Sequence, residues 1–162
     1  MSRVDDIQEI FTRNGTDKSS HNYAQVYAQI PENITTMLEI GITDSSLRSW
    51  TELFPQALIY GVDREVKNFD HPRVKLVVSD INDLNPFYWE KMDLIVDDGS
   101  HDHYDQLAGW FKLTDKLCGT YIIEDLSAEQ ADRLYHLLGR FNPKIVNCRE
   151  DQNGSRCLII KK

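Results

Sequence analysis

From Thr36 onward, short apolar runs alternate along the chain with segments in which apolar residues recur at helical spacing. The runs are almost continuously hydrophobic, which is typical of strands in a parallel sheet that is covered on both faces. Five strands are predicted from them, at residues 36–42, 57–63, 74–80, 92–98 and 119–125. Because strands and helices alternate, the pattern predicts an α/β fold with a mostly parallel, Rossmann-like sheet.

Helical patterns flank these strands. Two lie ahead of the first strand, so residues 1–35 are expected to form a helical cap on a core of residues 36–162, all within a single domain. The predicted helices cover residues 3–13, 22–30, 47–54, 103–117 and 127–141. The connections 64–73 and 81–91 are too short for full helices, so the helical layers should be reduced.

The final segment, 144–162, has the pattern of an antiparallel hairpin that turns at Asn153-Gly154. A two-residue turn at that point would place Cys148 opposite Ile159 and leave Cys157 with a different partner. The three cysteines of the chain also lack the spacing of a metal site, so we expect free thiols.

Composition and charge exclude several classes of protein. The formal net charge of -8 argues against a nucleic-acid partner, which would require a basic surface. No run of apolar residues is long enough to span a membrane, and acids near the N-terminus occupy positions where a signal peptide would be apolar. We therefore expect a cytoplasmic protein without a membrane partner. Its short helices would leave apolar faces that a homo-oligomer could cover.

Acidic residues close four of the five predicted strands: Asp63, Asp80, Asp98 and Asp125. A further acid, Glu39, lies within the first strand. Ligands of open α/β sheets bind outside the carboxyl ends of the strands, so these acids are candidates for one shared site. Each acid could instead only cap the helix that follows it, but capping does not readily explain five of them together.

The segment 38–50 predicts a strand, a turn containing Gly41 and a helix whose first N–H groups are free. It has one glycine, so the dinucleotide pattern GxGxxG is absent and an NAD enzyme is disfavoured. Asp63 stands where an acid accepts hydrogen bonds from ribose hydroxyls, and Asp80 could meet the adenine amine. Recognition of a nucleoside by acids, without a pyrophosphate cradle, suggests the positively charged S-adenosylmethionine.

Five segments of the chain resemble the class I methyltransferases, and among them the metal-dependent sugar O-methyltransferases of the mycinamicin and macrocin type. They are NGTDKSSHNYAQVY (14–27), MLEIGITDSSLRSW (37–50), FPQALIYGVD (54–63), DLIVDDGSHDHY (93–104) and GTYIIEDL (119–126). The combination of VDDGSH with IIEDL is the specific part. The resemblance implies a sheet that ends in an antiparallel hairpin, with S-adenosylmethionine and Mg²⁺ as cofactors.

The resemblance also implies roles for individual residues. The expected magnesium ligands are Asp98, Glu124 and Asp125, and the expected general base is His101. The residues expected near the cofactor are Thr16, Lys18, Glu39, Gly41, Ser46, Asp63, Asp80 and Asp97. Those expected near the substrate, on an element that folds over the active site, are Asp17, His21 and Tyr23.

The residues themselves point to similar chemistry. Asp98 and the pair Glu124-Asp125 end neighbouring strands, and ligands that are all oxygen suit Mg²⁺ better than zinc. The predicted function is methyl transfer to a hydroxyl of a small molecule, a sugar or another polyol. Two alternatives remain: a silent module that binds S-adenosylmethionine, and a metal-dependent hydrolase using the same carboxylates. Members of the family are usually longer, so their macrolide specificity does not carry over.

Overall fold

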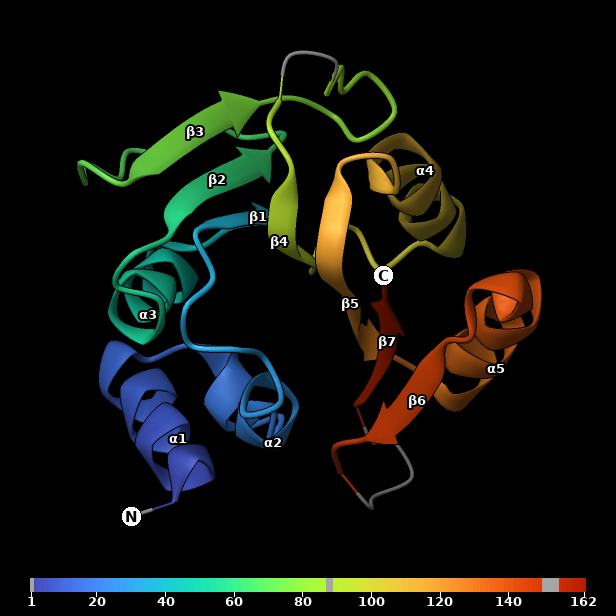
Figure 1. Cartoon of the computed structure of the whole chain (residues 1–162), viewed down its shortest axis with the longest axis horizontal. Helices are drawn as coiled ribbons and strands as arrows, with labels where there is room; N and C mark the ends of the chain where they lie inside the picture. The colour runs from blue at the N-terminus through green and yellow to red at the C-terminus, as the bar shows by residue number, and fades with distance from the viewer. Residues whose placement is uncertain (1, 87–88, 150–154) are drawn as a thin grey trace.

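Seven strands form one sheet in the computed structural model, which describes residues 2–86, 89–149 and 155–162. The strand order is β3-β2-β1-β4-β5-β7-β6. Strands β1 to β5 run parallel, whereas β7 is antiparallel to both β5 and β6. This arrangement, seen across the centre of Figure 1, confirms the predicted Rossmann-like sheet with an antiparallel C-terminal pair.

Each predicted strand coincides with an observed strand apart from a residue or two at its ends. The strands are β1 (Thr36–Ile40), β2 (Leu58–Asp63), β3 (Val74–Val78), β4 (Met92–Asp97), β5 (Leu117–Leu126), β6 (Lys144–Asn147) and β7 (Arg156–Lys161). The agreement follows from the buried apolar runs, which are a local signal.

The helices lie in the expected places, although several are shorter than predicted. They are α1 (Arg3–Asn14), η1 (Asp17–Ser19), α2 (Ala24–Tyr27), α3 (Asp44–Leu53), α4 (His103–Leu113), α5 (Ala128–Leu137) and η2 (Gly139–Phe141). Within the described residues no α-helix lies between β2 and β3 or between β3 and β4, as the short connections predicted. None of the helices described is both long and apolar enough to cross a membrane.

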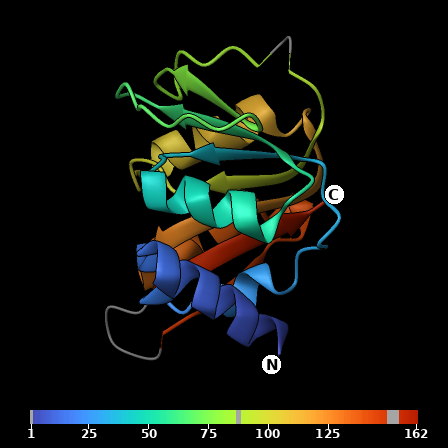
Figure 2. The same ribbon diagram turned by 90° about the vertical axis from the view of Figure 1, so that its left-hand side faces the viewer.

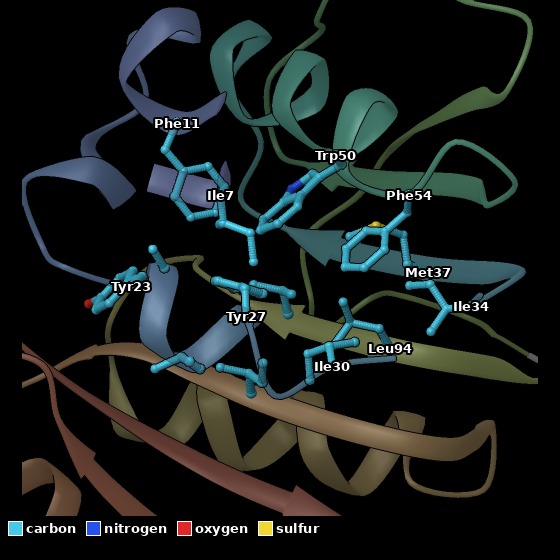
Figure 3. Packing of buried hydrophobic residues seen from close by; sticks show 14 of the residues in the cluster. Ile7, Phe11, Tyr23, Tyr27, Ile30, Ile34, Met37, Trp50, Phe54 and Leu94 are labelled. Atoms are coloured by element: carbon cyan, nitrogen blue, oxygen red, sulfur yellow. The ribbon is translucent and has the colours of Figure 1, made fainter. Parts of the chain in front are cut away.

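The helices cover the sheet on both faces. Helices α1, α2 and α3 lie on one face, and α4 and α5 on the other (Figures 1 and 2). Successive strand residues point to opposite faces, so Met37 packs in the first layer and Leu38 in the second. Figure 3 shows the first layer, where Phe11, Tyr27 and Trp50 from three helices meet edge to face or tilted. The N-terminal helices therefore share the core of the sheet.

The helix predicted at 103–117 ends earlier than expected, well before Gly119. Helix α4 stops at Leu113, and Gly119 lies inside β5. A Cβ atom on Gly119 would lie 2.9 Å from the carbonyl carbon of Asp93. The glycine therefore allows β5 to pass close to β4 at the irregularity in their register between Met92 and Leu94.

The predicted register of the terminal hairpin is wrong. Val146 lies opposite Cys157, and the Cys148 N–H donates to the Ser155 carbonyl over 3.0 Å, so Cys148 does not face Ile159. The predicted turn at 153–154 lies outside the described residues. The sulfur atoms of Cys148 and Cys157 are 3.9 Å apart, and all three thiols are free, as expected.

Candidate active site

The turn after β1 lies directly against the end of β4. Gly41 has a φ of +76°, and its N–H donates to the Val62 carbonyl over 2.8 Å. A Cβ atom on Gly41 would lie 2.7 Å from both the carbonyl carbon of Asp98 and the Cα of Gly99. The Asp98 N–H in turn donates to Ile40 over 2.9 Å. Only glycine fits this position, for reasons of conformation and of space.

A cleft of about 270 Å³ opens where β1 to β4 end. Four residues expected near the cofactor line it together: Gly41, Asp63, Asp80 and Asp97. Asp63 accepts hydrogen bonds from the Ile42 N–H (3.2 Å) and the Glu65 N–H (2.8 Å), which fixes its carboxylate at the rim. This position, outside the carboxyl ends of the strands, is where ligands of such sheets bind.

Asp97 forms the buried end of this cleft. Its side chain accepts a hydrogen bond from the Tyr121 hydroxyl over 3.3 Å, and burial raises the pKa of Asp97 to about 7. Gly109 of α4 leaves room for it, since a Cβ atom there would lie 3.0 Å from both the carboxylate and the Tyr121 hydroxyl. The cleft thus ends at an acid whose charge is costly unless a positive partner is present.

Four other residues expected near the cofactor do not line the cleft: Thr16, Lys18, Glu39 and Ser46. Glu39 is fully buried on the face of β1 that α1 to α3 cover, and the Ser46 hydroxyl donates to it over 2.7 Å. Burial raises the pKa of Glu39 to about 7. Thr16 caps η1 by accepting from the Lys18 N–H. The side-chain alternation along β1 therefore separates Glu39 and its neighbours from the cleft.

Lys18 lies at the centre of three buried or half-buried carboxylates. Its side chain is 1% exposed, and its Nζ donates to Asp98 Oδ2 over 2.7 Å and to Glu124. The same Nζ is 3.5 Å from Glu39 Oε1 and 5.5 Å from the centre of the Trp50 ring. Burial alone would lower the pKa of Lys18, but the three carboxylates outweigh it and hold the pKa well above its usual range.

On the outer side of this cluster, Asp98, His101 and Asp125 come together. Each offers one ligand atom, and these atoms lie within 4.8 Å of one another, a spacing that suits a metal ion. His101 and Asp125 both have left-handed backbones, with φ of +58° and +54°. Such conformations are strained in residues other than glycine and are often found at functional sites. The Gln130 side chain donates to the His101 carbonyl over 2.8 Å and so fixes this turn.

Glu124 lies outside this group of ligand atoms. It is fully buried, and the Tyr27 hydroxyl and Lys18 both donate to its carboxylate. Neighbouring residues of a strand point to opposite faces, and β5 has an irregular register between Ile123 and Leu126. The structure therefore brings together two of the three expected magnesium ligands, and the role of Glu124 as a ligand stays a prediction.

The residues expected near the substrate gather around Asp125. The Tyr23 hydroxyl donates to its carboxylate and accepts from its backbone N–H, and His21 Nδ1 lies 2.8 Å from the same carboxylate. Asp17, His21 and Asp125 also form a second group with metal-ligand spacing. The segment between α1 and α2 thus contacts the end of β5, as its predicted place over the site requires.

The chain is similar in sequence to curated O-methyltransferases. No family model matches the chain. It is 31% identical over 140 residues to the 8-demethyl-8-alpha-L-rhamnosyl tetracenomycin-C 2'-O-methyltransferase of Streptomyces olivaceus, an alignment that covers 70% of this chain and 36% of that protein. It is also 31% identical over 148 residues to the demethylmacrocin O-methyltransferase of Streptomyces fradiae, which covers 75% of this chain and 36% of that protein. The chain therefore spans just over a third of the length of these curated relatives.

Among solved structures, MycE methyltransferase from the mycinamycin biosynthetic pathway, in complex with Mg, SAH and mycinamycin VI, superposes with a TM-score of 0.70. The match covers 96% of this chain and 54% of that one, at 22% identity. The chain has the class I methyltransferase fold. Its curated relatives are O-methyltransferases of the macrocin and mycinamicin type, so the resemblance seen in the motifs is confirmed.

Sequence reasoning missed several buried polar groups that contact the residues of this candidate site. Tyr27 and Gln130 lie within predicted helices and Tyr121 lies within a predicted strand, and no role at the site was expected for them. Their polar atoms instead reach Glu124, Asp97 and the His101 carbonyl. A hydroxyl on a residue of an apolar face is the one signal that could have suggested such partners, because a buried tyrosine hydroxyl usually finds one.

Proposed function

We propose that the chain carries the catalytic site of an O-methyltransferase that uses S-adenosylmethionine and Mg²⁺. The acceptor would be a hydroxyl of a sugar or another small polyol. The observation that carries the proposal is that Asp98, His101 and Asp125 converge beside a cleft lined with acids at the strand ends. The 2'-O-methyltransferase of a rhamnosylated compound among the relatives supports a sugar hydroxyl as the acceptor.

The cleft suits a cationic nucleoside. Asp63 lies at its rim, where its remaining lone pairs could accept from the ribose hydroxyls. Asp97 lies at its buried end, where a positive ligand would favour the ionised carboxylate. Gly41 leaves room for a ligand to approach the backbone. The methyl donor would then lie within the same strand-end region as His101.

The ligand set fits a hard divalent cation. The carboxylates of Asp98 and Asp125 lie within 4.8 Å of each other, and Mg²⁺ is usually held by one or two carboxylates together with water and substrate oxygens. Such an ion, when bound, supplies Lewis acidity that lowers the pKa of a hydroxyl beside it. The carboxylate of Asp98 accepts a hydrogen bond from Lys18, and that of Asp125 accepts one from Tyr23.

His101 would take the proton of the acceptor hydroxyl on a ring nitrogen. The acceptor oxygen then forms a bond to the methyl carbon as the carbon–sulfur bond of the sulfonium breaks, and neutral S-adenosylhomocysteine leaves. The fixed turn at His101 and the buried Asp97 would supply orientation and charge stabilisation, which carry most of the rate enhancement in such a transfer.

Replacing His101 tests this assignment. In His101→Ala, methyl transfer from S-adenosylmethionine to a panel of saccharides, detected as a mass gain of one methyl group, should fall at least about 100-fold. The affinity for S-adenosylhomocysteine, measured by calorimetry, should remain. His136→Ala is the matched control, because His136 is exposed on α5 and pairs only with Asp132 at 3.5 Å among its described ion pairs.

Two results would contradict the proposal. An unchanged rate of methyl transfer in His101→Ala would show that His101 is not the general base. Binding of Mg²⁺ without any affinity for S-adenosylhomocysteine would instead favour a hydrolase that uses the same carboxylates.

A further inference from the structure

Lys18 and a divalent ion would need the same carboxylates. The ammonium group of Lys18 contacts Asp98 and Glu124 from the buried side of the cluster. Asp98 also belongs to the outer group of potential metal ligands with His101 and Asp125. Two of the three acids that the sequence motifs assign to the metal are thus engaged by a positive charge that the chain itself supplies.

The two cations oppose each other electrostatically. A monovalent ammonium on one oxygen of Asp98 would repel a divalent ion on the outer side of the same side chain, and this repulsion is strong because Lys18 is 1% exposed and little screened by solvent. If the ammonium withdrew, both Asp98 and Glu124 would regain free lone pairs. Lys18 therefore determines how many carboxylates the site can offer to a metal.

One short segment carries both Lys18 and His21, a neighbour of Asp125. It lies between two residues with left-handed backbones, Gly15 with a φ of +71° and Asn22 with a φ of +60°. Its inner side presents Lys18 to Asp98, and its outer side presents His21 to Asp125. A displacement of Lys18 would thus also move a neighbour of the second carboxylate.

We propose that Lys18 is a built-in competitor of the divalent cation, so that its ammonium group and the ion are alternative partners of Asp98 and Glu124. The inference rests on the proposed function, since it concerns the same metal site. It accounts for the position of Glu124, which the motifs assign to the metal and the structure pairs with Lys18. Metal binding is then coupled to the segment between Gly15 and Asn22.

Calorimetric titration with Mg²⁺ tests the competition without any assay of activity. Lys18→Met should bind Mg²⁺ at least about tenfold more tightly than the wild-type chain, because one opposing charge next to the ion is gone. Lys91→Met is the matched control: it removes the same charge at the other end of β4, near Asp115, and should leave the affinity within about twofold. Lys18→Gln keeps a hydrogen-bond donor without the charge and should also bind more tightly.

Folding is followed in parallel by thermal unfolding. If Lys18→Met is unfolded without metal, Mg²⁺ should restore its fold, and failure of Mg²⁺ to do so would overturn the inference. Equal or weaker Mg²⁺ binding by folded Lys18→Met or Lys18→Gln would overturn it as well.

A second readout follows Lys18 directly. The ¹⁵N resonance of its ammonium group, assigned by its loss in Lys18→Gln, should shift or broaden when the wild-type chain is saturated with Mg²⁺, and an unchanged resonance would refute displacement. If the wild-type chain binds Mg²⁺ and the Lys18 variants bind it no more tightly, this inference fails and the proposed function stands. If no form binds Mg²⁺, the metal dependence of the proposed function fails together with it.

Discussion

Replacing Gly41 by alanine would force apart two strand ends that form the cleft. Gly41 has a φ of +76°, and an added Cβ atom would lie 2.7 Å from the carbonyl carbon of Asp98. The atoms in its way belong to the backbone, so no rotation of a side chain can relieve the overlap. Either the turn after β1 or the end of β4 must move, and both carry candidate site residues.

The expected loss of stability in Gly41→Ala has two contributions, and substitutions at two other glycines measure each contribution separately. A left-handed backbone costs a residue with a side chain about 1–2 kcal/mol. Gly15→Ala should show only this cost, because Gly15 has a φ of +71° and nothing lies within 4 Å of its added Cβ. Gly119→Ala should show mainly the overlap, 2.9 Å from Asp93, at the opposite end of β4. Gly41→Ala combines both, and we expect a loss of about 3–5 kcal/mol in the free energy of unfolding.

Urea unfolding followed by tryptophan fluorescence measures these losses, and calorimetry measures affinity for S-adenosylhomocysteine. Gly41→Ala should unfold at a lower urea concentration than Gly15→Ala. Its folded fraction should bind S-adenosylhomocysteine more weakly than the wild-type chain does. Gly119→Ala should lose stability but keep that affinity, because its overlap lies far from the cleft. A Gly41→Ala variant as stable as Gly15→Ala would refute the reasoning, since the overlap with Asp98 would then cost nothing.

Two further predictions concern buried groups. Burial raises the pKa of Asp97 from 3.8 to about 7, so protonated Asp97 favours the folded state at low pH, and this contribution is lost as the pH rises through about 7. In Asp97→Asn, the free energy of unfolding, measured with urea, should therefore fall less between pH 5 and 8, by roughly 2–4 kcal/mol. An unchanged fall would contradict the raised pKa of Asp97. In the native chain one thiol, that of the exposed Cys118, should react quickly with a thiol reagent, whereas Cys148 and Cys157 should react only on unfolding. Rapid reaction of two thiols, or of one in Cys118→Ser, would show that the buried pair is accessible.

Local patterns determined most of the fold. The near-continuous apolar runs located β1 to β5, the helical spacing located the helices, and the acids at the strand ends marked the edge of the sheet at which the site lies. These features depend on residues close together in the chain, whose alternation of strand and helix permits few topologies. Motifs such as VDDGSH and IIEDL indicate the same edge of the sheet.

Packing between distant parts of the chain decided how the site residues face one another. Lys18 meets Asp98 and Glu124 across separations of 80 and 106 residues, and no periodicity in the sequence reports such a meeting. Along β5, Glu124 is buried and Asp125 is half-buried, both within the irregular register between Ile123 and Leu126.

The sequence by itself determined the fold class and the edge of the sheet where chemistry is expected, because hydrophobic periodicity and strand-end acids are local features. Only the tertiary structure decided that Lys18 joins the carboxylates, that Glu124 lies outside the group formed by Asp98, His101 and Asp125, and that Cys148 lies near Cys157. Side-chain direction and strand register are settled by the packing of the whole core, where a shift of one residue turns a side chain to the other face.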